Sequence, residues 1–236
     1  MPRGLRITLV ILLVLGGLFV GADRLAVHFA EDRLADEVRA ARSAEDVEVS
    51  IGGFPFLTQI AGRDLESVDI TISGMTTNSG ERTLEVRKFD VRARDIALNS
   101  SYSGGVAQEA TGTAYLTYED LSAAADEGVS LAYGGAAEGG ASKVEVTGSV
   151  YVPLLDRTIE RSTTSTISVE NGDTIRLRAD EVPGEGIPGV EELIREKIDY
   201  TRQINGLPSG VALTGIKATE DGVEVAFSGS RVSVTG

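Results

Sequence analysis

The chain begins with an apolar run unlike anything later in the sequence. Arg3 and Arg6 precede residues 7–22, which hold no charge, and Asp23 is the first charged residue beyond them. A basic start followed by an apolar segment is typical of a secretory signal or an N-terminal anchor. As a helix the run would be about 24 Å long, short of the roughly 30 Å of a bilayer core. Because it also ends in a small residue, we expect cleavage after Ala22, with a retained anchor as the alternative.

The two arginines ahead of the run favour the cytoplasmic side of a membrane, so either outcome carries the rest of the chain outward. We therefore predict that residues 1–22 are a signal peptide or membrane anchor and that residues 23–236 form one exported domain, because no shift in composition divides them further. Such a domain belongs to the cell envelope, at the outer face of the plasma membrane or in a periplasm-like space.

Residues 23–42 predict an amphipathic helix. Val27, Leu34 and Val38 recur at helical spacing, together with two alanines, and charged residues fill the opposite face. We expect this stripe to pack inward on the sheet and to line one side of a cavity; the alternative is that the helix continues the N-terminal segment as an exposed and mobile membrane-proximal stalk. A second helix is predicted over 190–203, where four aliphatic residues share a face and two glutamates fill the first turn.

From Val47 onward the period of the pattern changes to two, as in half-buried strands. Asn171-Gly172 and Asp221-Gly222 predict tight hairpin turns. Near Lys88 the alternation slips by one residue, which predicts a β-bulge and a bent strand. The stretches 134–142 and 182–189 are predicted to be loops. The expected strands lie at 47–51, 68–72, 83–98, 110–118, 143–152, 158–170, 174–180, 211–219, 223–228 and 231–235.

These elements predict an α+β fold in which a long N-terminal helix and a second helix pack on one strongly bent antiparallel sheet. Composition narrows the function. The chain has no cysteine, which excludes disulfides, a thiolate nucleophile and thiolate metal ligands. Its net charge of −14 repels nucleic-acid phosphate, so we expect no nucleic-acid partner.

Catalytic patterns are almost missing from the sequence. His28 is the one histidine, so no second imidazole supports a metal site. Residues 184–189 match G-x-G-x-x-G, but Arg176 and Arg178 alternate with the apolar residues of the preceding strand. One face of that strand is therefore exposed to solvent, whereas a dinucleotide-binding strand is buried on both faces. We therefore do not interpret residues 184–189 as a dinucleotide-binding motif. We expect no enzyme, no cofactor and no metal.

The most informative segment is Gly52–Ile60, which is uncharged and flanked by glycines. It carries five apolar side chains in nine residues between strands that alternate with polar positions. One interpretation is a core corner that closes the end of the sheet. The other is the wall of an apolar cavity that contacts an acyl chain. The residues concerned are Phe54, Pro55, Phe56, Leu57 and Ile60.

The stretch 47–59 resembles the signature of the LmeA-like family of exported actinobacterial phospholipid-binding proteins. The resemblance continues in order through 112–114, 118–121, 204–211 and 221–223. It implies the tubular lipid-binding fold of bactericidal-permeability-type proteins, with a long helix and a bent sheet around a lipid cavity. It also implies binding of phospholipids, phosphoinositides among them, and a role in lipomannan and lipoarabinomannan maturation.

Our leading hypothesis is therefore a non-enzymatic carrier or sensor of phospholipid, and the alternative is an envelope structural or interaction module with a fully packed core. We expect Phe54, Pro55, Phe56, Leu57 and Ile60 to border the lipid, with Val27, Leu34 and Val38 opposite them. A basic cluster on the strand over 83–98 is the candidate for an anionic headgroup, since guanidinium groups suit phosphate. The alternative is a wet strand face whose bases pair with neighbouring acids. The cluster consists of Arg87, Lys88, Arg92 and Arg94.

Overall fold

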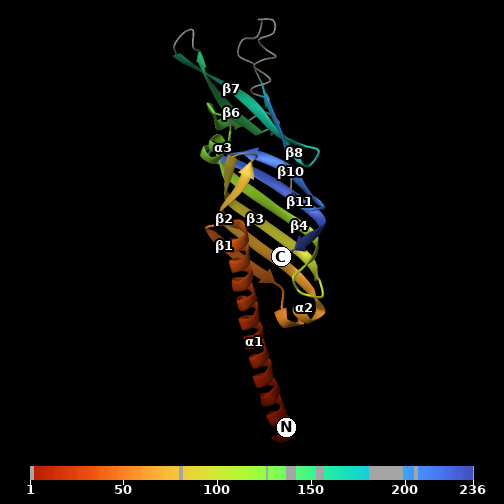
Figure 1. Ribbon diagram of the computed structural model, residues 1–236. Coiled ribbons are helices and arrows are strands. Elements are labelled where there is room, and N and C mark those ends of the chain that lie inside the picture. Colours follow the sequence, from red (N-terminus) through yellow and green to blue (C-terminus); the bar gives the residue numbers. More distant parts are fainter. Residues whose placement is uncertain are drawn as a thin grey trace.

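A single helix, α1 (Arg3–Arg42), connects the apolar N-terminal run to the body of the molecule (Figure 1). The computed structural model describes residues 3–79, 82–125, 127–136, 142–152, 157–180, 199–204 and 207–235. The N-terminal half of α1 projects from one end of the body, and its C-terminal half lies against the first strands. Two short helices, α2 (Phe56–Gly62) and α3 (Tyr118–Ala124), complete the helices of the described residues.

The described strands form two antiparallel sheets. The six-stranded sheet has the order β1-β2-β3-β4-β11-β10, and the five-stranded sheet has the order β5-β6-β7-β8-β9. The second sheet lies at the end of the body opposite the projecting part of α1 (Figure 1). The strands are β1 (Asp46–Gly52), β2 (Asp64–Ser79), β3 (Arg82–Leu98), β4 (Gly104–Thr117), β5 (Val129–Ala136), β6 (Ser142–Val152), β7 (Arg157–Glu170), β8 (Thr174–Ala179), β9 (Tyr200–Gln203), β10 (Val211–Ala218) and β11 (Gly222–Thr235).

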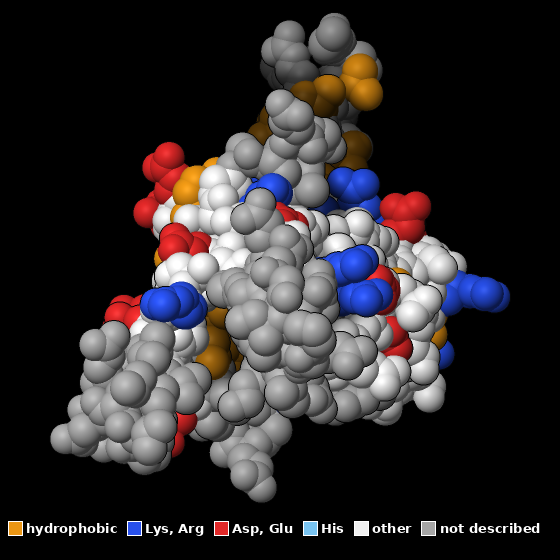
Figure 2. Space-filling model, turned by 90° about the horizontal axis from the view of Figure 1, so that it is seen from above, with side chains coloured by type: hydrophobic (Ala, Val, Ile, Leu, Met, Phe, Trp, Pro, Cys, Tyr) orange, Lys and Arg blue, Asp and Glu red, His pale blue; other side chains and the backbone are white. Residues whose placement is uncertain are grey.

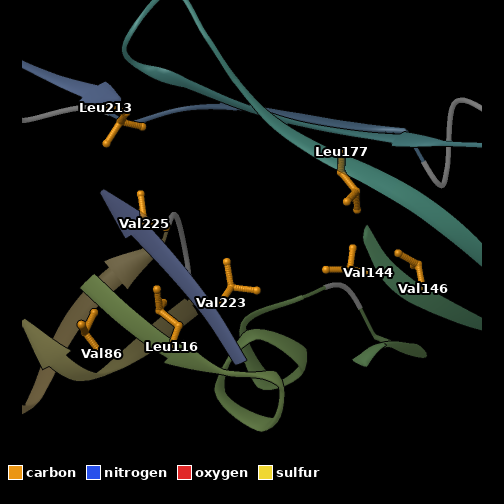
Figure 3. Packing of buried hydrophobic residues seen from close by; sticks show 8 residues of the cluster. All are labelled: Val86, Leu116, Val144, Val146, Leu177, Leu213, Val223 and Val225. Atoms are coloured by element: carbon orange, nitrogen blue, oxygen red, sulfur yellow. The ribbon is translucent and has the colours of Figure 1, made fainter. Parts of the chain in front are cut away.

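One apolar cluster joins the two sheets (Figure 3). Val144 on β6 and Leu177 on β8 pack with Leu116 on β4 and Val223 on β11, and all four are buried. Because these side chains come from alternate positions of half-buried strands, the cluster follows directly from the period of two in the sequence. The second sheet is thereby fixed to the first.

The predicted α+β class with a long N-terminal helix is confirmed. The prediction of one sheet is wrong, because the strands divide into two. The predicted second helix is wrong over 200–203, which form β9 and pair with β8, and the rest of its range up to 198 lies outside the described residues. The end of β5 falls in a stretch predicted to be a loop, since its glycines interrupt the alternation.

The predicted bulge near Lys88 is also wrong. β3 keeps a single register with β2, from the pair Asp64–Ala97 to the pair Ser79–Arg82. The ladder is interrupted without a change of register at Gly74, which has a φ of 62°, and at Arg87 opposite it. Both apolar sets on β3 are still covered, because Leu84, Val86 and Phe89 all pack in the cluster that joins the two sheets. Phe89 also stacks on Phe227, with 5.2 Å between the ring centroids.

Candidate functional site

The corner between β1 and β2 is built by glycine and glutamine. Gly53 has a φ of 88°, and a Cβ atom there would lie 2.6 Å from the Gln59 side chain, so the position requires glycine. The Gln59 amide donates to the Gly52 carbonyl at 3.2 Å and accepts from the Glu66 backbone N–H at 2.8 Å. These bonds close the corner and set α2 across the end of the sheet.

A carboxylate from α1 holds the other side of α2. The Leu57 backbone N–H donates to the Asp23 carboxylate at 2.8 Å, and the Arg24 side chain donates to the same carboxylate at 3.2 Å. The carboxylate thus satisfies one of the N–H groups that a helix start leaves unpaired. Asp23 has no exposed surface. Its burial beneath α2 attaches the long helix directly to the corner.

An apolar cluster lies between α1, α2 and the six-stranded sheet, and we call it the corner cluster. Its buried members are Val27, Phe56, Leu65, Ile96 and Ala107, and Leu57 and Ile60 pack against it half-buried. The structure therefore brings together four of the residues expected to border the lipid, from two separate stretches of sequence. These four are Val27, Phe56, Leu57 and Ile60.

The other expected lipid residues lie apart from the corner cluster. Phe54 is 57% exposed, and the Arg24 guanidinium lies over its ring at 5.0 Å. Pro55 is half-buried and immediately precedes α2. Val38 packs in a second cluster with Ala35, Val47 and Ile72, and Leu34 is half-buried on α1. Ala35 was missed by the sequence analysis, although it adjoins the predicted stripe.

Two hollows lie on the described surface. One of about 440 Å³ lies between α1 and β1, and carboxylates such as Glu31, Asp32 and Glu48 line it. The other, of about 350 Å³, contains Arg92 and Arg94 on β3 among Glu66, Asp69 and Asp95. The candidate headgroup residues Arg92 and Arg94 are therefore neighbours, but acids surround them.

The four candidate headgroup residues do not lie together in the structure. Arg92 is paired with Asp69 on β2, and Lys88 is paired with Asp90 at 2.9 Å. Arg92 and Arg94 lie on the face of β3 opposite Ala93, which packs in the corner cluster. A headgroup in their hollow would be separated by the sheet from acyl chains at the corner cluster.

Arg87 contacts a different part of the molecule. Its guanidinium donates two hydrogen bonds to Asp120 on α3, at 2.9 and 3.1 Å. Thr117 donates to the same carboxylate at 2.5 Å. Burial acts to raise the pKa of Asp120, but the hydrogen bonds from Arg87 and Thr117 outweigh it and hold the pKa below its usual range. This ion pair anchors α3 to the sheet.

A sequence model of the LmeA-like phospholipid-binding family matches residues 21–228, which include the corner, both sheets and most of the body. Comparison with curated proteins and with solved structures found no significant match. Among the described residues, one helix is long and apolar enough to cross a membrane, Ile7–Arg42 of α1, with a mean hydropathy of 2.1 in its most apolar window.

Proposed function

This chain belongs to the LmeA-like phospholipid-binding family, and we propose that it carries or senses phospholipid, without catalysis, at the outer face of the plasma membrane. The observation that carries the proposal is the corner cluster, where apolar residues of α1 and of the family-like segment meet. We place the acyl chains against Val27, Phe56, Leu57 and Ile60. An acyl chain gains about 0.8 kcal/mol for each CH₂ group that leaves water, so such a site needs few polar contacts.

Access to the corner cluster would require α2 to move. This helix has only seven residues and stands between glycines at Gly53 and Gly62. The Leu57–Asp23 bond and the bonds of Gln59 hold it in place. A short element with so few polar attachments opens at a lower free energy than the sheet does. We therefore propose α2 as the gate through which acyl chains enter.

The headgroup and the wider role extend the same proposal. Because the sheet separates their hollow from the corner cluster, we propose Arg92 and Arg94 as a contact for headgroups of the anionic membrane surface and not of the lipid in the corner, with Arg87 and Lys88 held by their own acids. The resemblance of residues 47–59 to the family extends the proposal to phosphoinositides and to support of lipomannan and lipoarabinomannan maturation. The competing candidate is an envelope interaction module, and the near-complete burial of Phe56 and Ala107 favours it.

Lipid extraction separates the two candidates. The full chain, purified in mild detergent, is examined by native mass spectrometry and its lipids are extracted and identified. We expect phospholipid to remain bound, Ile60→Ala to reduce its amount, and Ile216→Ala to leave it unchanged. Ile216 is the matched control, because it is also a half-buried isoleucine but packs in the cluster between the sheets. Absence of phospholipid, or equal loss in both variants, would favour the interaction module.

A further inference from the structure

One stripe of α1 stays apolar beyond the point where the sequence places its first charge, although Arg24 and His28 are exposed beside it. Asp23 points beneath α2 and has no exposed surface. On the opposite side of the helix, Leu25 and Phe29 are 74% and 69% exposed. They continue the line of Leu18 at spacings of seven and four residues, which fall on one helical face. The first charge therefore does not end the apolar surface.

This continuation increases the length of α1 that could lie within a bilayer. From Ile7 to Phe29 this stripe of α1 is about 34 Å long, longer than the roughly 30 Å of a bilayer core, so its last residues reach the headgroup layer beside α2. The estimate of about 24 Å from the sequence ended the apolar run at Ala22, because it assumed that the Asp23 carboxylate faces outward. Cleavage after Ala22 would also place a new ammonium group on Asp23, a residue with no exposed surface. Charges in such places are costly unless they are paired.

Two aromatic–arginine pairs lie at the ends of α2. Arg24 lies over the Phe54 ring, and Arg63, which ends α2, lies over the Tyr102 ring at 5.7 Å. Phe54 and Tyr102 are both about half exposed. Aromatic rings and long basic side chains are the residues that favour the boundary between lipid and water. α2 lies at the end of the body from which α1 projects (Figure 1).

The opposite end of the molecule, formed by the second sheet, shows no comparable grouping of charged side chains in its described part. Seen from the side of the second sheet, the visible basic and acidic side chains are interspersed and do not gather by sign (Figure 2). Among the described residues, both aromatic–arginine pairs lie beside α2, at the end that α1 leaves and where a membrane crossed by α1 would be.

We propose that residues 1–22 remain attached as a membrane anchor and that the α2 corner rests in the headgroup layer of the bilayer that α1 spans. Phe54 and Tyr102 enter this layer, and Arg24 and Arg63 contact anionic headgroups there. The Leu57–Asp23 bond fixes the corner to the anchor, so the domain stands on the membrane in one orientation. This proposal goes beyond lipid binding by the domain and holds whether or not the corner cluster contains an acyl chain.

The first experiment measures whether the anchor is retained. The full chain is expressed in a bacterial host with a signal peptidase, and the membrane and soluble fractions are separated. We expect the intact mass of the full chain in the membrane fraction, resistant to extraction with alkaline carbonate. A chain that begins at Asp23 and lies in the soluble fraction would overturn the proposal.

The second experiment measures the position of the corner. Because the chain has no cysteine, F54C, Y102C and Y200C each carry one fluorescent label, in full chain reconstituted in vesicles of phosphatidylcholine and phosphatidylglycerol. Tyr200 is the matched control, since it is exposed to the same extent as Tyr102 (47% against 49%) but lies on β9 in the second sheet. We expect headgroup-linked spin labels to quench the probes at 54 and 102 severalfold more than the probe at 200. Equal quenching at all three positions, or none at 54 and 102, would overturn docking of the corner even if the anchor is retained.

Discussion

Two phenylalanines in one tripeptide give a sharp test of the corner. Phe54 and Phe56 have the same chemistry and flank Pro55, but Phe56 is 5% exposed and Phe54 is 57% exposed. We compare Phe56→Ala with Phe54→Ala and expect very different losses of stability. If the corner is packed as described, the difference in burial decides most of the difference in stability.

The magnitudes follow from the surroundings of each ring. Removing a buried phenylalanine from a packed cluster typically costs about 3–5 kcal/mol, because a cavity is left as well as lost apolar contact. Phe54 has less than half of its surface out of water, which corresponds to about 1 kcal/mol. Its exposed contact with the Arg24 guanidinium adds about 0.5–1 kcal/mol. We therefore expect the free energy of unfolding to fall at least about 1 kcal/mol further in Phe56→Ala than in Phe54→Ala.

The assay is urea unfolding of the full chain in mild detergent, followed by circular dichroism. With a slope of about 2 kcal/mol per molar urea, Phe56→Ala lowers the midpoint by about 1.5–2.5 M and Phe54→Ala by less than about 1 M. Lipid bound to each folded variant is measured in parallel, and we expect it to fall more than the helical and strand signals do. Equal shifts of the two midpoints would refute the packing of Phe56. Outright unfolding of both variants would identify the corner as a plain core plug.

Three further predictions concern other parts of the molecule. Arg92→Ala combined with Arg94→Ala weakens binding to anionic vesicles and lowers its salt sensitivity, while binding to zwitterionic vesicles is unchanged. Amide exchange over 27–38 is slow, because α1 packs on the sheet and is not a free stalk. Asp120→Asn flattens the acid limb of the stability profile. A carboxyl with a lowered pKa stabilises the fold above its ordinary value near 4 and loses that contribution as the pH falls through the lowered pKa.

Each of these has its own control. For the double variant the control is Arg176→Ala, another half-exposed arginine in an ion pair, on β8; equal loss for both vesicle types would remove Arg92 and Arg94 from the proposal. Exchange over 27–38 as fast as that of an unprotected peptide would identify α1 as a stalk. For Asp120, an acid limb identical to that of the natural chain would assign the pH dependence to other carboxyls.

Local patterns predicted most of the strands because each is half-buried and shows its period of two. The turn at Asn171-Gly172 is an example: both residues adopt positive φ, 55° and 74°, and β7 pairs directly with β8. The chemistry of the two residues alone determines such a turn. The corner at 52–60 was also visible in the sequence, because an uncharged apolar cluster interrupts the alternation of the amphipathic strands on either side of it.

Elements fixed by distant partners could not be predicted in this way. β9 has four residues, too few to show an alternation, and it is defined by its ladder with β8. Arg87 is close in sequence to Arg92 and Arg94, but Asp120, 33 residues away, draws it to α3. Nothing in a contiguous run of basic residues indicates which of them will find an acid in the folded chain.

Asp23 is the residue at which sequence and structure lead to opposite conclusions. In the sequence, a charge after an apolar run marks the end of the segment that lipid can surround, which makes the run too short to span a bilayer. In the structure, the same carboxylate faces α2 and accepts the Leu57 N–H, so its charge is turned away from the side of α1 that carries Leu25 and Phe29. The limit of a membrane segment is a property of the exposed face and not of the residue order. For this chain it favours an anchor fixed to the α2 corner, as proposed above, over a signal that is removed.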